Sequence, residues 1–141
     1  MRRADVTFEF VELMPPLLED GVIYISMTFA TACHLCMCGC GEKVVTPFSP
    51  TDWKLTFDGI SISISPSIGN WDYKCRSHYW ISNNRVHWAP PWTHEQVMAA
   101  REREGKEKDF YYGELPAEPK PVTPPGTAFF SRLLRFFGRG K

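Results

Sequence analysis

Cysteine residues with a spacing suited to metal binding are concentrated in the stretch HLCMCGCG, residues 34–41. A Cys-x-x-His pair follows further along the chain, in the stretch CRSH of residues 75–78. Zinc prefers thiolate sulfur and imidazole nitrogen in a tetrahedral arrangement, which two short ligand groups separated by a hairpin-sized insertion can supply. The sequence therefore predicts a metal site, with zinc as the expected ion. The candidate ligands are Cys36, Cys38, Cys40, Cys75 and His78, one more than a closed site needs.

The same thiols have other interpretations. The N-terminal residues lack an apolar segment followed by a cleavage site, so we expect a cytoplasmic protein whose thiols stay reduced, which disfavours disulfides. A reactive-thiol centre remains as the rival interpretation. Alternate residues of a strand point to opposite faces, so the set of thiols that binds one ion stays open. Cys33, in the apolar run FATAC, is expected to be a small buried hydrophobic residue.

Whether the metal is catalytic or structural depends on the number of protein ligands. Hydrolytic sites keep one position for water, whereas structural sites close with four protein ligands. Thiolates donate charge and make the ion a weaker Lewis acid, which favours a structural role. Three candidate catalytic residues keep the other interpretation open, namely His34, Ser77 and Glu12.

Each of these three residues also has a structural interpretation. His34 is suited to hydrogen-bond a ligand thiolate, and Ser77 is suited to shape a turn. Glu12 would act as a general base only if it reached the metal from the first strand, and an exposed carboxylate is the simpler expectation.

Composition limits the classes of function. The chain has 141 residues, 43% hydrophobic and 14% aromatic, which suits one compact domain with appendages. Sixteen basic and sixteen acidic side chains cancel, so we expect no nucleic-acid partner, because little electrostatic affinity for phosphate remains. No run approaches the ~18 apolar residues of a transmembrane helix.

Alternating apolar and polar residues predict a mainly β domain over residues 1–92, within an α+β protein. The expected strands are residues 6–12, 22–27, 42–45, 53–57, 60–64, 79–82 and 85–88. Asp58-Gly59 and Asn83-Asn84 each predict a two-residue hairpin turn, since Gly and Asn tolerate positive backbone angles. Together with the cysteine groups, these hairpins indicate a small domain that is similar to a zinc ribbon.

The composition changes after Pro90-Pro91. Thr93 and Gln96 form a capping-box pattern, which predicts a charged helix over residues 93–113. Residues 114–126 are rich in proline and predict an extended linker. Residues 127–141 include TAFFSRLLRFF, which as a helix would be basic and amphipathic. Such a tail suits a membrane surface or a partner groove, or packs back on its own domain.

Several segments resemble a family of small bacterial proteins of unassigned function, often encoded beside ubiquitin-like proteins and their activating and conjugating enzymes. The segments are FVELMP, GVIYIS, HLCMCGCGEKVVTPFSPTDWKLTFDG, SISPSIGNW and CRSHYWISNNRVHWA, between about Phe8 and Ala89. The resemblance implies a metal site built from the four cysteines and His78, in a ubiquitin-like modification or antiphage system. It also suggests a processing or deconjugating peptidase, because such gene sets commonly include one.

Two functions therefore stay open. The first is a zinc-dependent peptidase that acts on a ubiquitin-like protein or its conjugates, which requires only three protein ligands on the ion. The second is a non-catalytic, zinc-stabilised module that binds a protein such as a ubiquitin-like protein or its conjugating enzymes, with four ligands on the ion. The resemblance favours the first function, and the chemistry of the residues favours the second.

Overall fold

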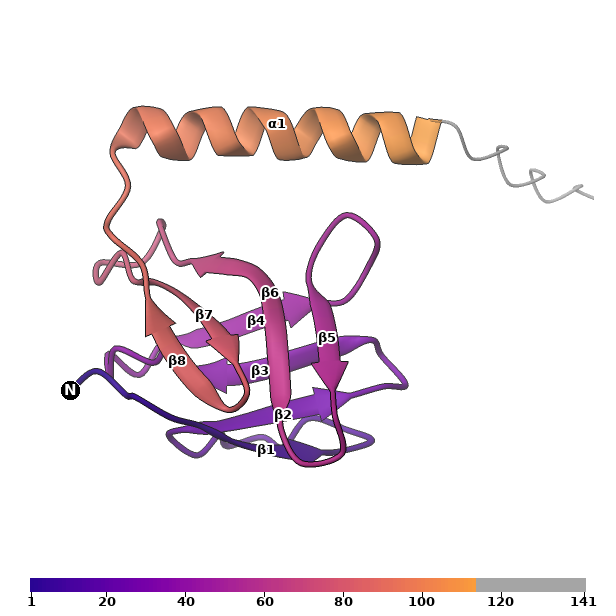
Figure 1. Cartoon of the computed structure of the whole chain (residues 1–141), viewed down its shortest axis with the longest axis vertical. Helices are drawn as coiled ribbons and strands as arrows, with labels where there is room; N and C mark the ends of the chain where they lie inside the picture. The colour runs from indigo at the N-terminus through magenta and orange to yellow at the C-terminus, as the bar shows by residue number, and fades with distance from the viewer. Residues whose placement is uncertain (114–141) are drawn as a thin grey trace, which may run out of the picture.

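The computed structural model of the chain describes residues 1–113. The predicted linker (residues 114–126) and basic tail (residues 127–141) lie outside the described residues. The described part forms eight strands and one helix (Figure 1): β1 (Thr7–Phe10), β2 (Val22–Ser26), β3 (Thr31–Leu35), β4 (Lys43–Pro47), β5 (Lys54–Phe57), β6 (Ile62–Gly69), β7 (His78–Ser82), β8 (Arg85–Trp88) and α1 (His94–Gly113). The prediction of a mainly β protein with a C-terminal helix is confirmed.

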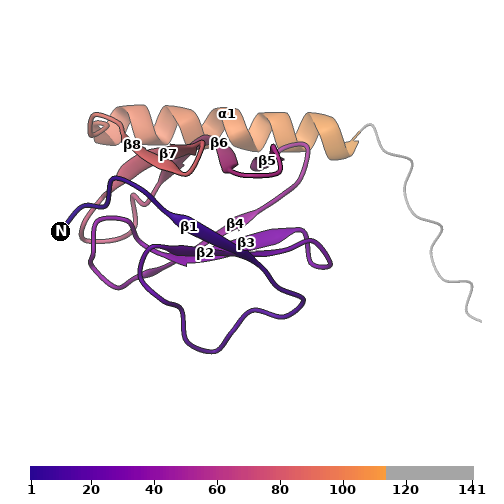
Figure 2. The ribbon, with the colours of Figure 1, turned by 60° about the horizontal axis from the view of Figure 1, so that its bottom comes forward.

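The strands form two four-stranded sheets that lie in separate layers (Figure 2). The strand order is β1-β2-β3-β4 in the first sheet and β5-β6-β7-β8 in the second. Neighbouring strands are antiparallel, except that β1 runs parallel to β2. The N-terminal segment joins the two sheets, because Asp5 forms an isolated bridge with Arg85 at the start of β8.

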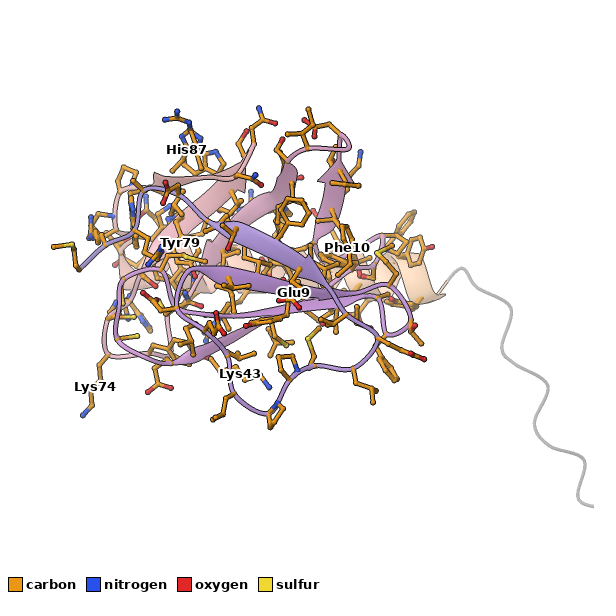
Figure 3. All side chains as sticks on the ribbon, turned by 90° about the horizontal axis from the view of Figure 1, so that it is seen from below. Glu9, Phe10, Lys43, Lys74, Tyr79 and His87 are labelled. Atoms are coloured by element: carbon orange, nitrogen blue, oxygen red, sulfur yellow. The ribbon has the colours of Figure 1, made fainter. Side chains whose placement is uncertain are left out.

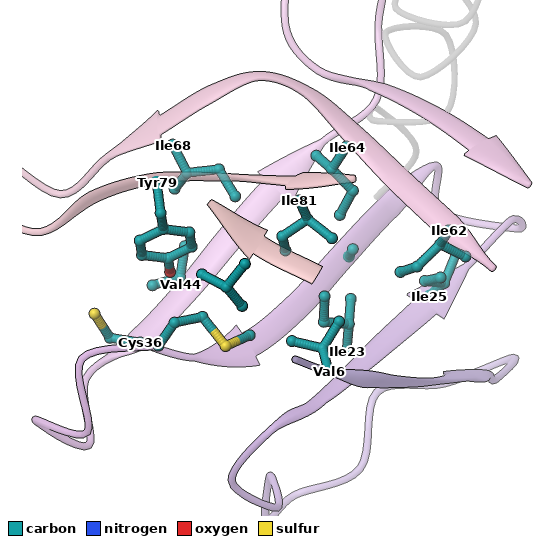
Figure 4. Close-up of a cluster of buried hydrophobic side chains, with 13 residues drawn as sticks. Val6, Ile23, Ile25, Cys36, Val44, Ile62, Ile64, Ile68, Tyr79 and Ile81 are labelled. Atoms are coloured by element: carbon teal, nitrogen blue, oxygen red, sulfur yellow. The ribbon is translucent and has the colours of Figure 1, made fainter. Parts of the chain in front are cut away.

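The hydrophobic core fills the space between the sheets (Figure 4). The three isoleucines of β6, Ile62, Ile64 and Ile68, are at most 2% exposed, and the serines that alternate with them face the other way. Tyr79 and Ile81 of β7 also point into this core. The remaining positions of β6 and β7 therefore lie on the outer face of the second sheet, on the side of α1 (Figure 2).

The two predicted hairpin turns differ in outcome. Asn83 and Asn84 adopt φ angles of 48° and 62° and join β7 to β8 as the expected two-residue turn. The loop after β5 contains four residues, 58–61, because Phe57 pairs with Ile62. The Asp58 carboxylate accepts hydrogen bonds from the backbone N–H groups of residues 60 and 61, at 2.8 Å and 2.6 Å, and so stabilises the longer loop.

Helix α1 begins at the predicted capping box. The backbone N–H of Thr93 donates to the Gln96 side chain at 2.8 Å, and the backbone N–H of Gln96 donates to the Thr93 hydroxyl at 3.3 Å. Val97 and Ala100 are the buried residues of the helix. Within residues 1–113, no helix is both long enough and apolar enough to cross a bilayer.

Strand β3 was not predicted from the sequence. Its central residues Ala32, Cys33 and His34 are all buried, so this strand lacks the alternation of a strand with one exposed face. The buried position of Cys33, at 3% exposed, agrees with its interpretation as a small hydrophobic residue.

Candidate active site and metal centre

Four thiol groups meet at one end of the domain, although they come from two distant segments. Cys36, Cys38 and Cys40 lie between β3 and β4, and Cys75 lies between β6 and β7. Their Sγ atoms are all within 4.8 Å of one another. The separations are 3.4 Å for Cys36–Cys38, 3.9 Å for Cys36–Cys75 and 3.8 Å for Cys40–Cys75. Lys74, next to Cys75, points away from the body of the domain at this periphery (Figure 3).

The sulfur cluster fits a metal ion. A tetrahedral zinc site with Zn–S bonds of about 2.3 Å places its sulfurs about 3.8 Å apart, close to the separations observed. The alternate cysteines converge because they lie in a loop rather than a strand, where Gly39 and Gly41 adopt φ angles of +88° and +82°. Four sulfurs complete a tetrahedron, so the set matches a closed site.

The thiols differ in acidity. Burial raises the pKa of the Cys36 thiol, and it raises the pKa of the Cys38 thiol to about 12. Burial also acts to raise the pKa of Cys75, but hydrogen bonds from the side chain and backbone of Ser77 outweigh it and lower that pKa to about 7. Four thiolates repel one another at this distance, and a bound cation would offset that repulsion.

Ser77 lies beside the sulfur cluster and belongs to its hydrogen-bond network. Its hydroxyl is 3.0 Å from the Cys36 Sγ and accepts a hydrogen bond from the Asn70 side-chain amide at 2.9 Å. Ser77 is 5% exposed, and its polar contacts in the described residues include no imidazole or carboxylate. The predicted catalytic serine is therefore brought to the thiols but not to a base.

His78, the fifth candidate ligand, does not join the four cysteines. Its Nε2 lies 2.8 Å from the hydroxyl of Ser67 on β6, and its Nδ1 lies 3.2 Å from the backbone carbonyl oxygen of Pro90. Both ring nitrogens of His78 are thus occupied by other groups. Ser77 immediately precedes β7 and His78 is its first residue, and successive side chains of extended backbone project to opposite faces.

The contacts of His78 define the state of its imidazole. A carbonyl oxygen only accepts hydrogen bonds, so Nδ1 must carry the proton that is shared with Pro90. When the ring is neutral, Nε2 has a free lone pair and is able to accept a hydrogen bond from the Ser67 hydroxyl. A serine hydroxyl that donates to an oriented imidazole is the arrangement that generates a serine nucleophile.

An irregularity in β6 directs Ser67 toward His78. Ile64 pairs with Ile81 and Ile68 pairs with Tyr79, so β6 has two more residues than β7 between these pairs. The extra residues form a bulge that includes Ser67. Bulges re-aim side chains and occur frequently next to active sites.

Ser67 and His78 line a cleft of about 570 Å³ between the outer face of the second sheet and helix α1. Trp53, Trp71 and Trp92 contribute apolar walls, and α1 contributes Val97, Ala100 and charged side chains. The helix is held at the cleft by ion pairs, from Arg101 to Asp72 at 2.9 Å and from Lys108 to Asp52 at 2.8 Å. An apolar cleft with a few convergent polar groups is the usual form of a binding site.

The two other predicted catalytic residues lie apart from Ser67. His34 is fully buried, and its Nε2 is 2.9 Å from the Tyr79 hydroxyl. Burial lowers the pKa of His34 to about 4, so the ring is neutral at pH 7. Glu12 is exposed after the end of β1, and its contact is a backbone one, because its carbonyl accepts the Ser26 hydroxyl at 2.9 Å. Neither residue lines the cleft.

Ser67 is not among the residues predicted from the sequence, although it lies in the segment SISPSIGNW that carries the family resemblance. The Cys-x-x-His spacing predicts His78 as a metal ligand, whereas the structure places its imidazole beside Ser67. The available signal was the antiparallel pairing of residues 62–69 with residues 78–82, which brings Ser67 and His78 to one face of the sheet. The bulge that completes their contact has no marker that we recognised in the sequence.

Comparison with known protein families gives one match. A family model described as "Bacterial ubiquitination-like system serine protease (BubE)" matches residues 10–89, more than half of the chain. This range contains Ser67, His78 and the four clustered cysteines. Searches of the curated proteins and of the solved structures give no match.

Proposed function

The chain belongs to the serine protease family of bacterial ubiquitination-like systems, and we propose that it is a peptidase with Ser67 as nucleophile and His78 as general base. The observation that carries the proposal is the 2.8 Å contact between the Ser67 hydroxyl and the His78 Nε2. The family description supports a serine mechanism independently of this contact.

The proposed reaction uses the two residues in sequence. His78 accepts the hydroxyl proton as the Ser67 oxygen attacks the scissile carbonyl carbon, and an acyl-enzyme forms as His78 returns the proton to the leaving amine. Water then attacks the acyl group, and His78 again takes and returns a proton. The Pro90 carbonyl accepts the Nδ1 proton and thereby leaves the Nε2 lone pair of the neutral ring available to the reacting hydroxyl.

We further propose that zinc, bound by Cys36, Cys38, Cys40 and Cys75, is structural. Four sulfur ligands leave no position for a catalytic water, so the zinc-dependent mechanism expected from the sequence is replaced by the serine mechanism. Bound zinc would neutralise the thiolates and tie the β3–β4 loop to the β6–β7 loop. Cys75 precedes His78 by three residues, so this link would fix the start of the strand that carries the base.

The substrate that we propose is the C-terminal tail of a ubiquitin-like protein, either extended by extra residues or joined to a target. The membership in a ubiquitination-like system supports this class of substrate. The open cleft along β6 and α1 suits an extended chain segment rather than a compact fold. The conjugating enzymes of the same pathway are further expected partners of the protein.

A non-catalytic binding module is the second candidate. The cluster of four cysteines favours this candidate, because an ion with four sulfur ligands has a structural role and is equally suited to a protein without catalytic activity. The binding-module hypothesis gives no role to the bulge that brings Ser67 to His78, and we therefore rank this hypothesis below the peptidase.

The proposal is tested by cleavage of a bacterial ubiquitin-like protein that carries a C-terminal peptide extension. We expect the Ser67→Ala and His78→Gln variants to lose about 10³-fold or more in kcat. Ser65→Ala is the matched control, because Ser65 is an exposed serine two residues earlier on the same strand. Cleavage by Ser67→Ala at the parental rate would overturn the proposal.

A further inference from the structure

Among residues 1–113, His78 has no carboxylate partner of the kind that orients the imidazole in many serine peptidases. Its polar contacts among residues 1–113 are the Ser67 hydroxyl and the Pro90 carbonyl, at 2.8 Å and 3.2 Å. The carbonyl fixes the tautomer, but one hydrogen bond leaves the ring free to tilt about it. Another part of the structure must therefore fix the plane of the ring if Nε2 is to stay directed at the Ser67 oxygen.

Two tryptophan rings pack against this imidazole. The centroid of His78 lies 4.9 Å from that of Trp71 and 4.8 Å from that of Trp92, at interplanar angles of 60° and 67°. The two indoles stack on each other at 5.3 Å and 16°. The three rings thus contact one another pairwise, and each limits the rotation of the other two. Both the tilted and the stacked pairs are arrangements that aromatic rings prefer.

The position of Trp71 depends on a residue without a side chain. Gly69 pairs with His78 across β6 and β7, and a Cβ at Gly69 would lie 2.3 Å from the Trp71 Nε1. The indole therefore lies directly on the backbone beside His78. Asp72, the next residue, accepts two hydrogen bonds of 2.9 Å from Arg101 of α1, which fastens this loop to the helix.

Trp92 is part of the segment that also supplies the Pro90 carbonyl. This segment connects β8 to α1, and the backbone N–H of Ala89 donates to the carbonyl of His78 at 2.9 Å. At its other end, Thr93 starts the helix through the capping box. The carbonyl and the indole thus reach His78 from one short segment that is fixed at both ends.

We propose that Trp71 and Trp92 are positioning residues that hold the His78 imidazole for Ser67 in place of a carboxylate. This inference rests on the proposed serine mechanism, and it assigns a role to residues on both sides of the base. The indoles act through His78 and transfer no proton themselves. Gly69 contributes to the same positioning, because the absence of a side chain leaves the space that the Trp71 indole occupies.

The test compares Trp92→Leu with Trp92→Phe, and Trp71→Leu with Trp71→Phe, in the full chain. We measure kcat and KM for p-nitrophenyl acetate and subtract the rate of Ser67→Ala. The leucine variants are expected to lose about tenfold or more in kcat with KM changed less than about twofold. The phenylalanine variants, which keep a flat ring, are expected to recover most of the rate.

A spectroscopic readout separates this inference from the serine mechanism. In the parent protein the Nδ1 proton of His78 is expected to give a resolved downfield proton resonance, because Pro90 shields it from exchange. Trp92→Leu and Gly69→Ala are expected to broaden that resonance, and Trp92→Phe is expected to keep it. If Ser67→Ala retained full hydrolysis, the serine mechanism would fail, while the resonance would still report whether the indoles hold the ring.

Two results would overturn the positioning role. One is an unchanged kcat with a raised KM in the leucine variants, which would mean that the indoles bind the substrate rather than position His78. The other is a sharp Nδ1 resonance in Trp92→Leu, which would mean that Pro90 alone fixes the ring.

Discussion

Ser67 and His78 lie 11 residues apart in the sequence, and the pairing of β6 with β7 brings the Ser67 hydroxyl to 2.8 Å from the His78 Nε2. The adjacent residue, Ser77, contacts the Cys36 sulfur instead, at 3.0 Å. The boundary between the candidate metal centre and the candidate active site therefore falls between two successive residues. A metal ion bound by the four cysteines would then stabilise the start of β7 without lining the cleft that contains Ser67 and His78.

Substitution of one cluster cysteine tests the metal centre. Cys75→Ser is expected to lose bound zinc and to lower the melting temperature, because Cys75 is the one cluster cysteine that comes from the β6–β7 loop. Metal analysis and a thermal melt measure the two effects. Cys33→Ala is the control, since Cys33 is a buried cysteine outside the cluster. A Cys33→Ala protein that lost its metal equally would contradict the assignment.

Exchange of the metal distinguishes a structural ion from a catalytic one. Replacement of zinc by cadmium, which also binds four thiolates, is expected to change peptidase activity by less than about twofold. A metal-bound water would be altered by the exchange, and the rate would then follow the identity of the ion. Activity that disappeared with cadmium and returned with zinc would restore the metal-dependent mechanism.

The buried pair of His34 and Tyr79 is expected to stabilise the fold. In Tyr79→Phe the His34 ring would lose its polar contact, because its Nδ1 has no partner among the described residues. The expected loss in free energy of unfolding is about 1–3 kcal/mol, measured by denaturant titration. Tyr24→Phe is a matched control, whose hydroxyl makes a longer contact of 3.4 Å. Equal losses for the two variants would refute a special role for the pair.

The β7–β8 turn provides a separate test of the strand that carries His78. Asn84 has a φ of 62°, and its side-chain oxygen accepts the backbone N–H of Ile62 at 2.9 Å. Asn84→Ala should cost about 1–3 kcal/mol of stability, since it combines backbone strain with a lost hydrogen bond. Asn83→Gly, where glycine suits the positive φ, should leave stability nearly unchanged. A neutral Asn84→Ala would show that the turn tolerates other conformations.

Features that depend on residues close together in the sequence could be predicted from the sequence. The Asn83-Asn84 turn and the Thr93 capping box both depend on side chains that act within a few residues, and the structure contains both. The grouping of the cysteines was also readable, because ligand type and spacing are local properties. The sequence could not separate His78 from the four cysteines. That choice depends on the face of the second sheet to which the first residue of β7 points, and no local pattern gives this face.

The active-site pair could not be read from the sequence for a different reason. Ser67 acquires its partner through a bulge, a shift of register that depends on how two strands pair over their full length. Pro90, which contacts the other ring nitrogen of His78, contributes only a backbone carbonyl, which every residue has. The wall of tryptophans comes from three separate segments, so composition indicated aromatic residues but not their meeting point.

Covalent labelling of the active serine tests the central claim most directly. A fluorophosphonate reacts with a serine that an adjacent base activates, and peptide mass spectrometry locates the adduct. We expect one adduct, on Ser67, that disappears in His78→Gln and persists in Ser77→Ala. An adduct on Ser77, or an active peptidase with no labelled serine, would contradict the claim that Ser67 and His78 form the catalytic pair.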